Sequence, residues 1–276
     1  IMREYCKKNL KIEINFGRFQ WGFLREVAVY SFWIFLNVIM DRIYWSTGQF
    51  VLGAVSGTIA VSIFAVAIQL QGMYMQFSTA ISSVFLPKVT GMVTLGDNKR
   101  EISDLFVRTG RIQYIVMSFI LFGFVVFGKP FIILWAGTDY IQAYIITLLF
   151  FIALIIPLIQ NLGITILQAR NQMMFRSVLY ILIAAVALVF QIILAKRYGG
   201  IGCAFAIAGA LFIGQGIVMN IYYSRRQNLN VLGFWKEILK MSLVPIFTSI
   251  LALYVTYNIV LINTWQKLFI GIIIYT

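Results

Sequence analysis

Two ionisable residues stand side by side inside an otherwise apolar stretch of the sequence. Asp41 and Arg42 are flanked by Val38-Ile39-Met40 and Ile43-Tyr44-Trp45. An ionisable side chain at such depth is costly, so it usually faces a bundle interior or a water-filled cavity. Neighbouring residues on a helix point about 100° apart, so the two pair poorly with each other. Arg42 therefore needs another partner: a residue of another helix, a ligand anion or a headgroup phosphate.

Two interpretations of this pair remain open. Asn37, Asp41 and Trp45 recur at intervals of four and share one helix face, which could contact an anion or a sugar. Alternatively, Arg42 is an anchor whose long side chain reaches the headgroups, because the pair lies near the end of its apolar stretch.

A second polar feature is a stripe of small and polar residues within residues 58–86. Gln69 and Gln76 are its two amides, seven residues apart. Such a stripe permits close helix packing, or it lines a hydrophilic cavity. Two glutamines are more than close packing needs, which favours the cavity. The members follow steps of three and four: Ser62, Ala65, Gln69, Gly72, Gln76, Thr79 and Ser83.

Two further features concern helix geometry. Pro157, shortly before Gln160 and Asn161, weakens its helix; it is either a plain kink or a conformational hinge, as where transporter helices break. Four small residues recur at intervals of four and predict a helix-packing face. They are Gly202, Ala206, Ala210 and Gly214.

The residues of an enzyme's active site are scarce. The sequence has no histidine and only nine Asp and Glu residues, most of them in connections. No metal-ligand spacing and no phosphate-binding loop appears, so we expect neither catalysis, nor a metal site, nor a cofactor. The two cysteines, Cys6 and Cys203, lie in dissimilar segments and do not predict a disulfide.

Composition places these residues in a membrane. Apolar residues make up 61% of the 276 positions and charged residues 11%, far from the values of soluble domains. Charge-free apolar runs of this length predict an all-α, polytopic transmembrane bundle. We expect residues 1–27 to form a basic connector, either an interfacial helix or a solvated segment. Seven complete spans and a shortened eighth should follow, at residues 28–45, 58–86, 112–127, 140–169, 177–195, 201–223, 241–262 and 268–276.

The net charge of +13 follows the same pattern. Seventeen Lys and Arg residues fall in alternate connections beginning with residues 1–27, and four fall in the others. Cytoplasmic loops gather these residues, so the N-terminal segment is predicted to be cytoplasmic and the chain not to bind nucleic acid. The last apolar run is too short to span a bilayer, so we expect the chain to be part of a longer polypeptide.

Five pieces of sequence, in order, resemble the second half of bacterial polysaccharide flippases. These proteins belong to the multidrug, oligosaccharidyl-lipid and polysaccharide exporter group. The first piece runs from Asp41-Arg42-Ile43-Tyr44-Trp45 through Phe50-Val51-Leu52-Gly53 to Thr58. The others are Phe85-Leu86-Pro87-Lys88-Val89, Leu134-Trp135-Ala136-Gly137 with Tyr140, Ile166-Leu167-Gln168-Ala169-Arg170-Asn171, and Tyr198-Gly199-Gly200-Ile201-Gly202.

The resemblance implies two similar helical bundles around a central cavity, worked by alternating access, with this chain as the C-terminal half. The implied substrate is an oligosaccharide repeat unit on undecaprenyl pyrophosphate, in the cytoplasmic membrane. Implied partners are membrane lipids, the N-terminal bundle and the polysaccharide polymerase machinery. A cationic cavity is typical of the family and fits Arg42. An acidic residue is common where this chain has Gln49, which leaves the role of residues 46–50 open.

Three rival functions remain. A cation-coupled drug exporter of the same fold would prefer an acidic, aromatic cavity, with Asp41 facing it and Arg42 turned away. A polysaccharide polymerase should carry a long external loop with catalytic charges, whereas every connection here is short. A non-transporting scaffold would have its cavity filled with bulky apolar side chains.

The charge distribution makes a topological prediction. In intact cells, a membrane-impermeant thiol reagent should label Ser56→Cys, because residues 46–57 form an external turn under the predicted orientation. Labelling only after the cells are permeabilised would overturn the orientation.

Overall fold

In the part of the chain that the structure describes, the protein is almost entirely helical and has no strand. This computed structural model describes residues 21–96, 98–258 and 264–275. The helices are α2 (Trp21–Val55), α3 (Thr58–Thr94), α4 (Lys99–Trp135), the 3-10 turn η1 (Thr138–Tyr140), α5 (Gln142–Ile159), α6 (Asn161–Ala169), α7 (Met174–Leu211), the π-helix η2 (Phe212–Val218), α8 (Met219–Arg225), α9 (Val231–Asn258) and α10 (Trp265–Tyr275). The all-α prediction is confirmed.

Six of the described helical stretches are long and apolar enough to cross a membrane, so this is a multi-pass membrane protein. One of them, Met174–Arg225, turns back on itself at Gly199, whose backbone is non-helical (φ 57°, ψ −137°). The Cys203 thiol then lies 3.7 Å from Gln191 Oε1, and Gly214 packs against Ile183. The two arms of this stretch therefore form an antiparallel hairpin.

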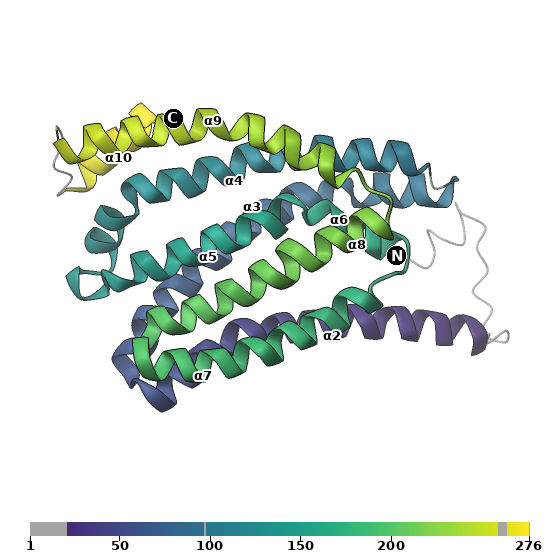
Figure 1. Ribbon diagram of the computed structural model, residues 1–276, viewed down its shortest axis with the longest axis horizontal. Helices are drawn as coiled ribbons and strands as arrows, with labels where there is room; N and C mark the ends of the chain where they lie inside the picture. Colours follow the sequence, from purple (N-terminus) through teal and green to yellow (C-terminus); the bar gives the residue numbers. More distant parts are fainter. Residues whose placement is uncertain (1–20, 97, 259–263, 276) are drawn as a thin grey trace, which may run out of the picture.

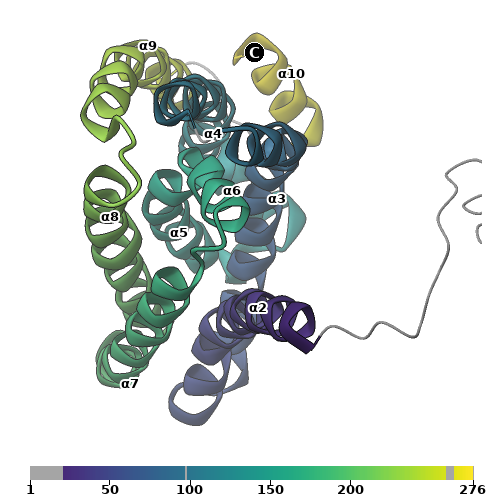
Figure 2. The same cartoon turned by 90° about the vertical axis from the view of Figure 1, so that its right-hand side faces the viewer.

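The helices pack as one elongated bundle (Figure 1). In cross-section, α2 and α7 lie at one end, α9, α4 and α10 at the other, and α3, α5 and α6 between them (Figure 2). Aromatic rings fill the centre: Tyr74 stacks on Phe151 with centroids 4.1 Å apart, and Trp45 and Phe64 meet Phe150 edge-on. This central packing holds α2 and α3 against α5.

The expected turn at residues 46–57 is an extension of α2 instead. The helix continues to Val55, and only Ser56 and Gly57 leave it, with Gly57 at φ 80°. The small residues serve packing: a Cβ on Gly48 would lie 2.8 Å from the Phe64 ring and 3.2 Å from Cys203 Sγ. The Thr47 hydroxyl donates to the Ile43 carbonyl within the helix. Small residues occur both in turns and at close contacts between helices, and here they mark a close contact.

Other boundaries also differ from the expected spans. Helix α2 begins at Trp21, inside the expected connector, whose first twenty residues lie outside the described ranges. Helix α4 runs from Lys99 through Pro130 to Trp135, past both ends of the expected span 112–127. With 37 residues it is about 55 Å long, more than the hydrocarbon core requires. Its charged first turns therefore extend the helix beyond the membrane, whereas the sequence predicted a separate short helix at residues 99–111.

The expected span 140–169 is broken. Pro157 has no N–H and its ring crowds the preceding turn, which weakens the helix. At Gln160 the backbone leaves helical geometry (φ −105°, ψ 14°), so α5 ends at Ile159 and α6 begins at Asn161. The last expected spans fall on α9, which begins at Val231, and on α10; residues 259–263 and 276 lie outside the described part.

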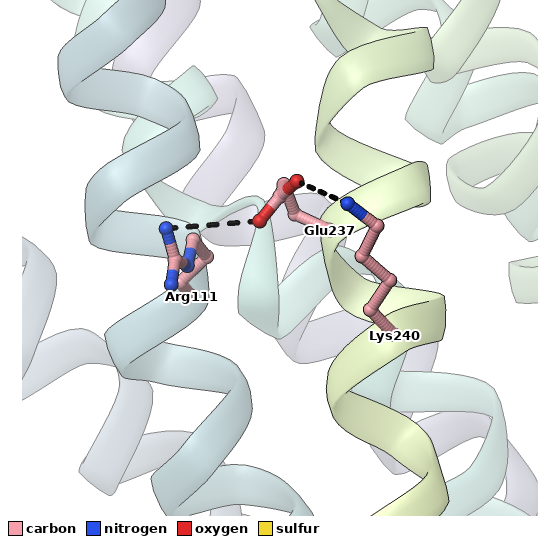
Figure 3. A network of polar contacts seen from close by, with 3 residues as sticks. All are labelled: Arg111, Glu237 and Lys240. Carbon is pink, nitrogen blue, oxygen red and sulfur yellow. Dashed lines mark hydrogen bonds and ion pairs between the residues drawn. The ribbon is translucent and has the colours of Figure 1, made fainter.

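Ion pairs of Glu237 lie between α9 and α4, near the charged ends of these helices (Figure 3). Glu237 lies 3.7 Å from the Arg111 guanidinium and 3.4 Å from the Lys240 ammonium. Nearby, the Tyr114 hydroxyl donates to Ser242 Oγ at 2.7 Å. The exposed ion pairs contribute little stability; Arg111–Glu237 joins the two helices, whereas Lys240–Glu237 lies within α9.

The helical hairpin makes a stability prediction. Gly202→Ala should lower stability by about 1–3 kcal/mol, because its Cβ would collide with the Leu194 carbonyl of the opposite arm. Gly209→Ala is the matched control, since nothing lies within 4 Å of its Cβ position. Thermal unfolding in detergent measures both; equal stability of the two variants would contradict the close contact.

Candidate functional site

The structure brings all five predicted substrate-contacting residues to one cavity of about 800 Å³. Asn37, Asp41 and Arg42 come from α2, and Gln69 and Gln76 come from α3. The periodicity of α3 explains the second pair, since residues seven apart lie two turns along one face. Further polar side chains lining the cavity are Ser46, Gln49, Gln71, Thr79, Asn161, Gln168, Arg176, Tyr180 and Gln215.

The charged lining is small and net positive. Among the described residues that line the cavity, Asp41 is the one acidic side chain, and Arg42 and Arg176 are the two basic ones. The described part of the chain contains no group of three or more His, Cys, Asp or Glu residues that could hold a metal ion. An excess of one positive charge inside membrane-spanning helices favours an anionic ligand group.

A hydrogen-bond network between α2 and α7 holds Arg176 in place. Arg176 Nη1 donates to Asn37 Oδ1 at 2.6 Å, and Asn37 Nδ2 donates to Ser177 Oγ. The Arg176 guanidinium also lies 5.0 Å from the centroid of the Tyr180 ring, a cation–π contact. The Tyr180 hydroxyl in turn donates to Asp41 Oδ1 at 3.2 Å. Both charged groups are thus oriented by neutral partners.

Arg42 stands in contrast to this network. Its side chain is exposed on the cavity side of α2 and makes no hydrogen bond or ion pair with the described residues. Arg176 Nε is buried, in contrast, but it also has no hydrogen-bond partner among the described residues. Both guanidiniums therefore keep N–H donors available, and a guanidinium can bind phosphate or carboxylate oxygens in pairs.

The amides of α3 fall into two groups. Gln69 and Gln76 are exposed towards the cavity and make no hydrogen bond with the described part of the chain. Gln71, also at the cavity, is 3% exposed and its amide contacts Met75 Sδ. The first group is therefore available to a ligand, whereas the second is committed to the helix itself.

The break at Gln160 borders the same cavity. Pro157 and Asn161 line it, and Asn161 Nδ2 donates to Ser78 Oγ at 3.3 Å. Ser78 Oγ donates to the Leu158 carbonyl at 2.6 Å, and the Gln160 backbone N–H donates to the same carbonyl, so α3 adds a bond at the end of α5. The hinge role of Pro157 stays a prediction, but the break lies where a ligand would touch it.

The predicted packing face lies elsewhere. Gly202, Ala206 and Gly214 are buried in the α7 hairpin and Ala210 is partly buried, and none of them lines the cavity. This position is consistent with packing between helices.

Sequence reasoning missed several residues of the site, among them Arg176, Tyr180 and Gln215. Arg176 was counted among the loop charges, yet α7 begins before it at Met174. Its interval of four from Tyr180 places both on one helix face, which was a usable signal. The second usable signal was Gln215, a lone amide in an apolar stretch. No pattern within one helix could show that Arg176 meets Asn37, 139 residues earlier.

Residues 6–145, about half of the chain, match the model of a family described as polysaccharide biosynthesis protein. The chain belongs to this family. It is therefore a multi-pass membrane protein with a role in polysaccharide synthesis or transport. The matched residues of this polysaccharide biosynthesis protein include α2 and α3, which carry all five predicted cavity residues. No curated protein and no solved structure matches the chain.

The two kinds of polar residue should differ in stability tests. Asn37→Leu should destabilise the protein by about 1–3 kcal/mol, because it leaves Arg176 without its hydrogen-bond acceptor. Gln69→Leu, at the same cavity but without an internal partner, should change stability by less than about 0.5 kcal/mol. Thermal unfolding of the purified variants gives the comparison; equal losses would contradict the structural role of Asn37.

Proposed function

We propose that the protein translocates undecaprenyl-pyrophosphate-linked oligosaccharide repeat units across the cytoplasmic membrane. The carrying observation is the net positive, amide-lined cavity between membrane-spanning helices. Such transport supplies the biosynthesis of capsule, O-antigen or exopolysaccharide, in keeping with the family. The protein would act by alternating access as a transporter, without a catalytic step of its own.

The cavity provides for each part of this substrate. Arg42 and Arg176 present unpaired N–H donors to the pyrophosphate, a charge-assisted contact that suits guanidinium geometry. Gln69 and Gln76 can donate to and accept from sugar hydroxyls. The lipid tail would remain in the bilayer, outside the polar lining.

Alternating access needs an element that can change shape, and the break between α5 and α6 is the candidate. Transporters commonly bind substrates near broken helices. We further propose that an N-terminal bundle of the same polypeptide completes the cavity, that the N-terminal segment is cytoplasmic, and that polymerase machinery receives the product.

A cation-coupled drug exporter is the second candidate, because Asp41 does face the cavity. However, Arg42 lines the same cavity instead of turning away, and Arg176 adds a second positive charge. A cationic drug would meet net repulsion here, which supports the anionic substrate. The open volume of about 800 Å³ also argues against a packed, non-transporting scaffold.

Substitution of Arg42 tests this function. In the full-length protein, Arg42→Ala should reduce substrate binding by about 10-fold or more and strongly impair polysaccharide export, because a charge-assisted contact contributes about 1.5–3 kcal/mol. Arg42→Lys should be partly active, since lysine keeps the positive charge but cannot bind phosphate through two parallel N–H groups. Export is measured as surface polysaccharide in cells that depend on this protein.

Arg225→Ala is the matched control, since Arg225 is exposed on α8 and outside the cavity. Membrane abundance is measured for every variant. Normal export by Arg42→Ala at normal abundance would overturn the proposal, and a defect confined to abundance would identify Arg42 as a membrane anchor.

A further inference from the structure

Gln215 is an unusual residue of the cavity wall. It belongs to the π-helix η2. π-helical turns are rare overall, but those that occur are often found at functional sites. Its side chain is 5% exposed and lines the cavity, yet Nε2 has no hydrogen-bond partner in the described part of the chain. A buried N–H group without a partner is costly, so it marks a place where a ligand acceptor or water is expected.

Gln69 and Gln76 extend this polar surface from another helix. Both reach the cavity without a hydrogen bond to the described residues. An amide donates and accepts at once, and so do a sugar hydroxyl and an N-acetyl group. A carboxylate, in contrast, only accepts.

The charge of the cavity adds a second constraint. Each phosphate of a pyrophosphate linkage carries a negative charge, and the described lining offers two guanidiniums and one carboxylate. A bound pyrophosphate therefore takes up the available positive charge. A further carboxylate on the sugar would lack a cation and would be repelled by Asp41, which is costly in a site of low polarity.

From these observations we infer that Gln215, Gln69 and Gln76 form a glycan subsite for uncharged sugar rings bearing hydroxyl and N-acetyl groups. The protein selects neutral sugars next to the lipid linkage and rejects sugars that carry a carboxylate. This inference rests on the proposed function and assigns the sugar class that the same cavity accepts.

Three soluble probes test the subsite with the purified full-length protein in lipid nanodiscs. They are farnesyl diphosphate, farnesyl diphosphoryl N-acetylglucosamine, and its analogue with a carboxylate at C6. The neutral glycolipid should bind about 10-fold more tightly than the carboxylate analogue, because a polar site discriminates against a group that it cannot pair. Equal binding of the two would overturn the inference.

Variants test the residues. Gln215→Met should weaken binding of the neutral glycolipid by about 3–10-fold and leave farnesyl diphosphate unaffected, because only the sugar loses a hydrogen bond. Gln191→Met is the matched control, as Gln191 is 1% exposed in the same hairpin but does not line the cavity. Should Gln215→Met fail to fold, Gln69→Met gives the same comparison at a solvent-accessible position. Unchanged glycolipid binding in the folded variant would contradict the subsite.

The two proposals fail differently. If none of the three probes binds, the proposed function is wrong and the subsite with it. If farnesyl diphosphate binds through Arg42 but the sugar adds nothing, the proposed function stands and the glycan subsite is wrong.

Discussion

The structure depends on the absence of water around membrane-spanning helices. A polar group there must find a partner inside the protein or face a wet cavity, because leaving it unpaired in hydrocarbon costs several kcal/mol. The break between α5 and α6 obeys this constraint. Ser78 of α3 donates to the Leu158 carbonyl at the end of α5. The Gln160 side-chain amide donates to Asn220 Oδ1 at 2.8 Å, which also accepts from Trp235 Nε1. The break is thereby held by three neighbouring helices.

The same constraint separates polar residues that build the protein from those that face the cavity. Asn37 is 7% exposed and uses both ends of its amide between α2 and α7, so it fixes the position of Arg176. Arg42 and Gln69 are exposed on the cavity side and make no such bonds. An unpaired guanidinium or amide is tolerated only where water or a ligand reaches it, so the second group marks the part of the cavity that is open to water or a ligand.

The sequence predicted the helical class and the polar faces, because periodicity and charge placement are properties of single helices. Asp41 with Asn37, and Gln69 with Gln76, therefore appear on their expected faces. The sequence did not predict how far the helices extend. Small residues such as Gly48 serve turns and close contacts alike, and only the packing partner, Phe64, distinguishes them. Nor could it predict Arg176 at the site, because that position depends on a contact between distant segments.

Residues that line the cavity also form hydrogen bonds at the break between α5 and α6, so a ligand in the cavity would lie beside the break. Asn161 lines the cavity and donates to Ser78 Oγ, the same hydroxyl that donates to the Leu158 carbonyl. On the other side, η2 carries Gln215 into the cavity and packs beside Pro157's neighbour Ile156, 3.5 Å from the Cβ position of Gly216. A ligand shifts a conformational equilibrium only through contacts that differ between the two states. Under the proposed function, residues that line the cavity and also contact the break would provide such contacts. Arg42, on the continuous helix α2, would contribute to affinity without changing the geometry of the break.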